Sequence, residues 1–252
     1  MNFKGVSETV GYIFIFGIVM TTVAYAFIHV SAIVKDTSDK YKIEGLRESF
    51  KRIQNVFFLS AYGGAPMQSI QSEIQGGRFY LSPEPEIKIE VIDSSGSHSI
   101  LNTNIGALNF EYGNYRISIE NGAVYENYYG FERTVVDPRI FIYQIETQST
   151  PGNYHKVLTI ILYKVKGNLS VSGMGALDLI FISNLNSSML KEEGGYVNLT
   201  IEKSSFTKKW CEYLGLLTTE IRCADDIVTT SFQFDKLVIA IFDVEVRYRI
   251  LS

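Results

Sequence analysis

Residues 10–34 read VGYIFIFGIVMTTVAYAFIHVSAIV and contain no side chain that is formally charged at neutral pH. A helix that crosses a membrane needs about 20 mostly apolar residues, because the hydrocarbon core of a bilayer is roughly 30 Å thick. The apolar part of an ordinary secretory signal is shorter, at about 7–15 residues. This stretch therefore predicts one membrane-spanning helix, and the rest of the chain is expected to be a domain that this helix carries.

The helical pattern continues beyond the apolar stretch to about residue 62. Apolar side chains recur there at helical spacing, with charged side chains between them. The apolar stripe consists of Ile43, Leu46, Phe50, Ile53 and Phe57. Gly63-Gly64-Ala65-Pro66 then stops the helix. We expect one long helix whose amphipathic part, residues 35–62, lays its stripe on the C-terminal domain. A short coiled coil is the competing interpretation.

After Pro66 the pattern changes from helical to alternating. Gly113-Asn114 and Asn121-Gly122 separate three alternating runs, as in β-hairpins, so residues 107–128 are expected to form an antiparallel meander. Ile87, Ile89 and Val91 indicate another strand. Further strands are expected near residues 134–147, 156–166, 168–173, 176–183, 195–203, 227–235 and 237–250. The predicted fold class is α+β, with the long helix followed by a mainly antiparallel β-sandwich-like domain over residues 63–252.

One short helix is expected among the strands, in SSFTKKWCEYLGLL at residues 204–217. Its apolar face consists of Phe206, Trp210, Tyr213, Leu214 and Leu217. Ser204 or Ser205 is expected to cap its start. We interpret Trp210, the single tryptophan of the chain, as a packing anchor rather than a platform for a ligand.

The charge and the motif content of the sequence limit the kinds of function that we expect. The 252 residues carry a net charge of −4 with both signs intermixed, which is not typical of a nucleic-acid-binding surface. The chain contains no H-E-x-x-H, G-x-S-x-G, P-loop or C-x-x-C motif, so we expect no enzymatic activity, no cofactor and no metal site. Asp225-Asp226 is expected to be a solvated turn. His29 lies within the apolar stretch and is expected to be neutral and packed against a neighbouring helix.

The two cysteines, Cys211 and Cys223, allow two interpretations. They are either reduced core thiols or one disulfide that closes a short loop outside the cell. We favour the disulfide, because other features also point to export. Three N-x-[ST] sequons, which N-glycosylation requires, begin at Asn168, Asn186 and Asn198. Asn198 alternates with Val197 and Leu199 and is expected to face solvent, and Asn186 is expected to lie in a polar loop.

The chain begins MNFKGVSET, which places Lys4-Gly5 just before the apolar stretch. An ordinary secretory signal is cut after its apolar part. Cleavage between Gly5 and Val6 would instead leave the whole apolar helix on the mature protein. Ser7 is expected to cap this helix, and Glu8 then lies in its first turn, where the helix dipole favours a carboxylate.

The segment KGVSETVGYIFIFGIV resembles the N-terminus of archaeal type IV pilin-like proteins, which carry class III signal sequences. Its Val-Ser-Glu-Thr-Val-Gly part is similar to the Val-Ser-x-x-Ile-Gly opening of many such proteins. The stretch RISIENGAVYENYYG and the helix around Trp210 also look like features of archaeal pilin-like heads.

The resemblance implies that residues 1–5 are a leader, which a prepilin peptidase removes. It implies that residues 6–62 form a helix through which like subunits, or other pilin-like proteins, assemble into a surface filament or pseudopilus. Bacterial type IV pilins carry a glutamate at the fifth mature position that pairs with a neighbour's amino terminus. Glu8 would be third, so it is either an assembly contact or a first-turn carboxylate.

The alternative function is a single-pass, membrane-anchored extracellular binding domain that never assembles, and an exported enzyme without a recognisable motif is a third class. The side of the membrane is also open to two interpretations. The positive-inside rule favours a cytoplasmic domain, because the apolar stretch is followed by Lys35, Lys40, Lys42, Arg47, Lys51 and Arg52. These charges are equally the polar face of the amphipathic helix. The Lys4-Gly5 junction, the three sequons, the possible disulfide and the aromatic-rich β domain point to export, so we predict that the domain lies outside.

Overall fold

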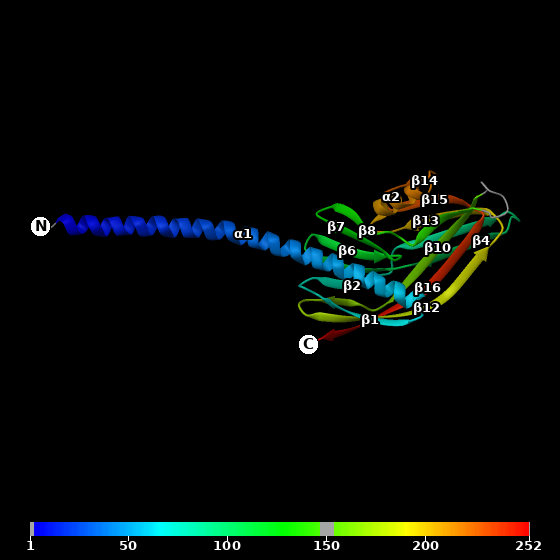
Figure 1. Ribbon diagram of the computed structural model, residues 1–252, viewed down its shortest axis with the longest axis horizontal. Coiled ribbons are helices and arrows are strands. Elements are labelled where there is room, and N and C mark those ends of the chain that lie inside the picture. The colour runs from blue at the N-terminus through cyan, green and yellow to red at the C-terminus, as the bar shows by residue number, and fades with distance from the viewer. Residues whose placement is uncertain (1–2, 147–153, 252) are drawn as a thin grey trace. The chain divides into compact units, whose positions relative to one another are not determined.

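The computed structural model describes residues 3–146 and 154–251. The chain divides into two compact units, residues 1–46 and residues 47–252, and we call the second unit the head. Helix α1 (Phe3–Tyr62) runs without interruption from the first unit into the second (Figure 1). The expected single long helix is therefore confirmed, and its last turns from Arg47 onward belong to the head.

The end of α1 follows from two glycines. The backbone N–H of Gly63 donates to the carbonyl of Leu59 at 2.8 Å. Gly64 then takes a φ of +66°, a left-handed conformation that a residue with a Cβ atom rarely adopts. Pro66 follows two residues later and cannot continue a helix.

The strands of the head form three sheets (Figure 1). The first has the order β1 (Met67–Glu73), β12 (Ala176–Lys191), β16 (Lys236–Leu251), β10 (Tyr154–Gly167) and β9 (Ile140–Glu146). The second has the order β11 (Ser170–Ser172), β2 (Arg78–Ser82), β5 (Ala107–Tyr112), β6 (Tyr115–Glu120), β7 (Ala123–Tyr128) and β8 (Phe131–Val136). The third has the order β14 (Ile221–Cys223), β15 (Ile227–Phe234), β13 (Gly195–Glu202), β3 (Glu86–Asp93) and β4 (His98–Asn104).

The pairing of these strands is mostly antiparallel. The exception among the described pairs is β10 with β16, which run parallel with Val157 opposite Lys236. The fold is therefore α+β, with one long apolar helix followed by a mostly antiparallel β domain. This is the coarse architecture that the sequence predicts.

The predicted meander is confirmed as strands β5, β6 and β7. Asn121 and Gly122 connect β6 to β7 with φ values of +48° and +73°. A two-residue hairpin turn of this kind needs positive φ at both positions, which explains the Asn-Gly pair. Asn121 also joins the meander to β10, since its Nδ2 donates to the Ile161 carbonyl and its Oδ1 accepts the N–H of Tyr163.

Two strand predictions need correction. Residues 134–146 are not one strand, because β8 ends at Val136 and β9 begins at Ile140. Pro138 stands between them and has no N–H to donate to a ladder; residue 147, the predicted end, lies outside the described residues. Strands β1, β2, β4 and β14 are not predicted by the sequence pattern.

The amphipathic end of α1 forms one core with the head strands. Phe50, Ile53 and Phe57 are fully buried. Phe50 packs on Phe79 and Phe110 of the second sheet, with ring centroids 5.9 and 6.5 Å apart. Phe57 packs on Tyr163 and Phe181 of the first sheet at 5.0 and 5.7 Å. In the head, the predicted apolar stripe is thus a core element that contacts two sheets.

Helix α2 (Thr207–Leu217) completes a second core, between strands of all three sheets. Trp210 is fully buried and lies against Tyr125, with ring centroids 6.0 Å apart, so the packing interpretation of Trp210 holds. The capping prediction is wrong. Phe206 is the N-cap, and no side chain caps the helix.

The serine hydroxyl has a different role. Ser204 Oγ accepts the N–H of Phe206 at 3.0 Å and donates to Glu120 Oε2 at 2.6 Å. It therefore holds the turn that precedes the helix instead of capping the helix itself.

Candidate functional site

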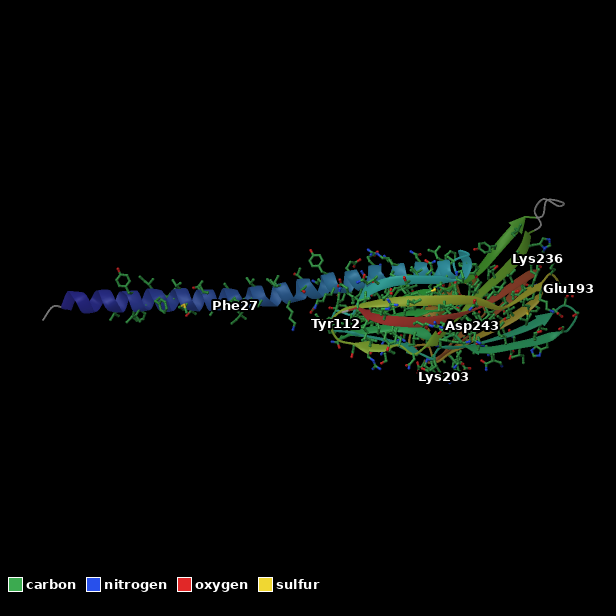
Figure 2. All side chains as sticks on the ribbon, turned by 90° about the horizontal axis from the view of Figure 1, so that it is seen from below. Phe27, Tyr112, Glu193, Lys203, Lys236 and Asp243 are labelled. Atoms are coloured by element: carbon green, nitrogen blue, oxygen red, sulfur yellow. A yellow bond between two sulfur atoms is a disulfide. The ribbon has the colours of Figure 1, made fainter. Side chains whose placement is uncertain are left out.

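The apolar segment of α1, residues 10–34, is the most distinctive surface of the chain. Within the part of the chain that the structure describes, α1 alone is long and apolar enough to cross a membrane. Phe27 is 72% exposed and projects from the helix, as do its neighbours (Figure 2). The exposed large apolar side chains of the segment are Val10, Tyr12, Ile13, Phe14, Ile15, Phe16, Ile18, Val19, Met20, Val23, Tyr25, Phe27, Ile28, Val30, Ile33 and Val34. Such a surface is stable only when lipid or other apolar side chains cover it.

The polar side chains of this segment are compatible with a lipid environment. The hydroxyls of Thr21 and Thr22 donate to the carbonyls of Gly17 and Ile18, each at 2.8 Å. These donors are therefore satisfied within the helix, as a bilayer core requires. The ring of His29 lies 4.3 Å from the ring of Tyr25, one turn earlier on the same helix.

The proposed leader junction falls in the first turns of α1. The backbone of Gly5, Val6 and Glu8 is helical, and their side chains lie outside the described part of the structure. Cleavage at Gly5–Val6 and an assembly role for Glu8 therefore remain predictions.

Within the head, a buried ion pair joins the last turns of α1 to strand β7. Arg47 Nε donates to Glu126 Oε2 at 2.9 Å, and the hydroxyl of Tyr115 donates to the same oxygen at 3.1 Å. Arg133 Nη1 lies 3.9 Å from the other oxygen of Glu126. The Glu126 side chain is only 6% exposed, so its charge depends on these partners. The helical pattern places Arg47 on the polar face of α1, and no local signal in the sequence predicts this contact.

Glu120 is a second buried carboxylate, at the end of β6. It is 2% exposed, and its Oε2 accepts hydrogen bonds from Ser204 Oγ and from Trp210 Nε1, the latter at 3.0 Å. Burial raises the pKa of Glu120 to about 7, and the hydrogen bonds from Ser204 and Trp210 act in the opposite direction. These contacts link the meander to α2.

The disulfide joins Cys211 of α2 to Cys223 of β14, with the two Cα atoms 6.1 Å apart. This distance is ordinary for a disulfide. The bond fastens the middle of α2 to strand β14, which follows it in the chain. The structure thus contains the disulfide that we favour from the sequence.

Replacing both Cys211 and Cys223 by serine is expected to lower the free energy of unfolding by about 3 kcal/mol, because the bond closes a short loop in the unfolded chain. Urea unfolding followed by Trp210 fluorescence measures this change. Reductant should destabilise the native protein and leave the double variant unaffected. Thiol labelling of denatured, unreduced protein should modify neither cysteine, and two labelled thiols would contradict the disulfide.

The three sequons lie in different environments. Asn168 is exposed in the connection between β10 and β11. Asn198 is half-buried in the middle of β13, between the buried Val197 and Leu199, so it faces away from the core as predicted. Asn186 is predicted in a loop, and this prediction is wrong, because Asn186 lies at a bulge within β12. Its Nδ2 donates to Asp243 Oδ2 at 2.8 Å, which leaves Asn168 as the sequon with the most open surroundings.

The acidic pair Asp225-Asp226 is exposed between β14 and β15. Among the described residues, no group of three or more His, Cys, Asp or Glu side chains is arranged to hold a metal ion. His98 and His155 lie on β4 and β10, in different sheets.

Comparison with known proteins gives a family and a relative. The chain matches the description "Family of unknown function (DUF7289)" over residues 4–247. It is 26% identical to an uncharacterized protein of Archaeoglobus fulgidus, in an alignment that covers 83% of each chain. No solved structure matches the chain. Because the family match covers α1 and nearly the whole head, this chain belongs to the DUF7289 family.

Proposed function

We propose that this protein is a pilin-like subunit of an archaeal cell-surface filament or pseudopilus. The observation that supports the proposal best is the continuity of α1. Its residues 10–34 expose an uncharged apolar surface, and the same helix ends in the core of the head. A filament subunit needs this combination, because the helix must pack against other helices while it holds the head firmly.

The same apolar surface serves two stages. Before assembly, lipid covers it and the protein is a single-pass membrane protein. In the filament, the helices of like subunits or of other pilin-like proteins take the place of the lipid. Lipid tails are as apolar as these side chains, so no hydrophobic force drives the helices together. Close packing between the helices instead offsets the loss of lipid contact and drives their association.

In this proposal the head is a β-sandwich-like domain that lies outside the cell. The disulfide between Cys211 and Cys223 supports this placement, because such bonds persist in oxidising compartments. Asn168 is the sequon that we expect to carry a glycan there. A prepilin peptidase would remove residues 1–5, and Glu8 would lie near the new amino terminus.

The first test of the proposal is N-terminal processing. Mass spectrometry of the membrane-associated protein is expected to give Val6 as the first residue. Gly5→Leu is expected to block cleavage and leave Met1. Gly11→Ala is the matched control, since an alanine Cβ at this position meets no atom within 4 Å, and it should leave cleavage intact. A native protein that keeps Met1 would favour the plain membrane anchor.

A second measurement distinguishes the filament subunit from the alternative, an anchored binding domain that does not assemble. Surface filaments sheared from cells and analysed by peptide identification should contain this chain. The Gly5→Leu protein should be absent from them and should accumulate in the membrane. Processed protein that is found in the membrane alone, with no filament, would remove the assembly part of the proposal.

A further inference from the structure

The head has a polar pocket of about 300 Å³ where strands of its first and third sheets meet the loop that follows α2. In the first sheet, Gln144 of β9 lies directly opposite Lys156 of β10, and both line the pocket. In the third sheet, Tyr196 of β13 lies opposite Gln233 of β15, and both line it as well. Residues 218–220, between α2 and β14, form the third wall. The volume is at the lower end of the range of small-molecule sites, about 300–1,000 Å³.

The loop wall of this pocket is held in place by hydrogen bonds. The N–H of Glu220 donates to Thr218 Oγ1 at 3.1 Å, and this hydroxyl donates to the Ser231 carbonyl at 3.3 Å. The N–H of Ser231 and the hydroxyl of Thr230 both donate to the Glu220 carbonyl, at 3.1 and 3.0 Å. The disulfide also ties together α2 and β14, the two elements that flank the loop. The pocket is therefore largely formed without a ligand, which lowers the entropic cost of binding.

The polar side chains that line this pocket have unused hydrogen-bonding groups. Within the part of the chain that the structure describes, six of them make no hydrogen bond or ion pair, namely those of Gln144, Lys156, Tyr196, Thr219, Glu220 and Gln233. Elsewhere on the head several exposed charges are paired, as Lys166 is with Asp243 at 2.9 Å and Lys203 with Glu86 at 2.8 Å. The side chains of the pocket are thus available to bind a ligand.

The chemistry of the lining indicates the class of ligand. Lys156 and Glu220 are its charged side chains and have opposite signs, so the lining carries no net charge and favours neither an anion nor a cation. The two glutamine amides and the Thr219 hydroxyl each donate and accept hydrogen bonds. Tyr196 is 51% exposed and adds an aromatic ring with a polar hydroxyl. A neutral ligand that has many hydroxyl groups and one face of C–H bonds fits all of these groups, and a pyranose sugar is such a ligand.

We propose that this pocket binds a saccharide. The ring of Tyr196 packs against the C–H face of a pyranose, while Gln144, Gln233 and the two charged side chains bind its hydroxyl groups. The sugar is either a free saccharide or the end of a glycan chain, because both present the same ring. The proposal goes beyond membrane anchoring and filament assembly and depends on neither.

The test uses two tyrosines that are equally exposed but lie differently. Tyr196 and Tyr143 are 51% and 53% exposed. Ile142 and Gln144 line the pocket, so Tyr143, which stands between them on β9, points to the other face of the strand. Tyr196→Ala therefore removes the ring from the pocket, and Tyr143→Ala is the matched control. Gln144→Ala is a second variant at an exposed site of the pocket.

The full-length proteins are solubilised in an amine-oxide detergent, because a detergent with a sugar headgroup would itself compete for the pocket. Saturation-transfer NMR measures binding of free glucose, galactose, mannose and N-acetylglucosamine. An array of immobilised oligosaccharides measures binding of glycan chains, and a ligand that is bound on the array alone identifies a chain as the source of the sugar. The urea midpoint of each protein, followed by Trp210 fluorescence, shows that the variants are folded.

The expected result is that native protein and Tyr143→Ala bind the same sugar or chain equally well. Tyr196→Ala is expected to bind it about tenfold more weakly or less, as for the loss of a central aromatic contact. Gln144→Ala is also expected to weaken binding. Native protein that binds none of the sugars and chains, or that binds inorganic phosphate more tightly than any of them, would overturn the proposal. So would a sugar affinity that Tyr196→Ala and Gln144→Ala leave unchanged. Each of these outcomes leaves N-terminal processing and assembly as they are.

Discussion

A soluble fragment that begins at Arg47 is expected to fold, and a fragment that begins at Gly64 is expected to remain unfolded. The shorter fragment lacks Phe50, Ile53 and Phe57, whose side chains are fully buried against the first and second sheets. Losing a large buried side chain costs about 3 kcal/mol or more. Three such losses reach roughly 9 kcal/mol, comparable with the whole stability of a typical domain at 5–15 kcal/mol.

Single substitutions in the longer fragment sharpen this prediction. Phe57→Ala is expected to lower the free energy of unfolding by about 3–5 kcal/mol, because it leaves a cavity between Tyr163 and Phe181. Leu59→Ala, two residues away on the same helix, is the control; Leu59 is 46% exposed, so the expected change is about 0.5 kcal/mol. Urea unfolding followed by Trp210 fluorescence measures both. Equal stability of the two variants, or a folded fragment from Gly64, would show that the end of α1 is not part of the core.

The second large effect is a dependence of stability on pH that arises from Glu120. Burial raises the pKa of its carboxyl from an ordinary value of 4.5 to about 7 in the folded protein. Below pH 4.5 the group is protonated in both states and contributes nothing. Between pH 4.5 and 7 the unfolded chain loses this proton first, so the folded state becomes less stable as the pH rises. The accumulated loss is about 3 kcal/mol and is complete above pH 7.

Glu120→Gln is expected to remove this loss. Ser204 and Trp210 both donate to one oxygen of Glu120, and the amide oxygen of glutamine accepts both hydrogen bonds. Glu193→Gln, at an exposed site, is the control and should keep the native profile. The measurement is the free energy of unfolding of the full chain at pH 5 and at pH 8. Parallel profiles for native protein and Glu120→Gln would show that Glu120 is not the group responsible.

Local signals in the sequence predict much of this architecture. The Gly63-Gly64 stop ends α1 at Tyr62, and Asn121-Gly122 makes the β6–β7 hairpin, because these residues permit backbone angles that others rarely adopt. Strand β1 is not predicted, because its sequence, MQSIQSE, contains only one β-branched apolar residue. The strand lies at the edge of its sheet and pairs with a neighbour on one side only.

The buried carboxylates are beyond the reach of local patterns. Side chains alternate along β6, so Glu120 lies on one face of the strand and Ile117 and Ile119 lie on the other. In a two-layer sandwich, the face that carries Glu120 would be exposed to solvent. Helix α2 covers that face, and its position depends on contacts between residues 90 apart in the chain, such as Glu120 with Trp210. Arg47 and Glu126 are likewise 79 residues apart. A single sequence carries no local signal for such pairs.

The topology of the first sheet has a consequence for how the protein is made. Strand β16 follows every other described strand in the chain, yet it lies between β12 and β10 at the centre of the sheet. Until the ribosome has released residues 236–251, β10 and β12 have no strand between them, and the head lacks its central pairing. Contacts between segments far apart in the chain also form slowly. The apolar segment of α1 precedes the head in the chain. A protein anchored through this segment, as we propose, is therefore held at the bilayer while most of its head is still unfolded, a state in which chaperones and proteases compete for it.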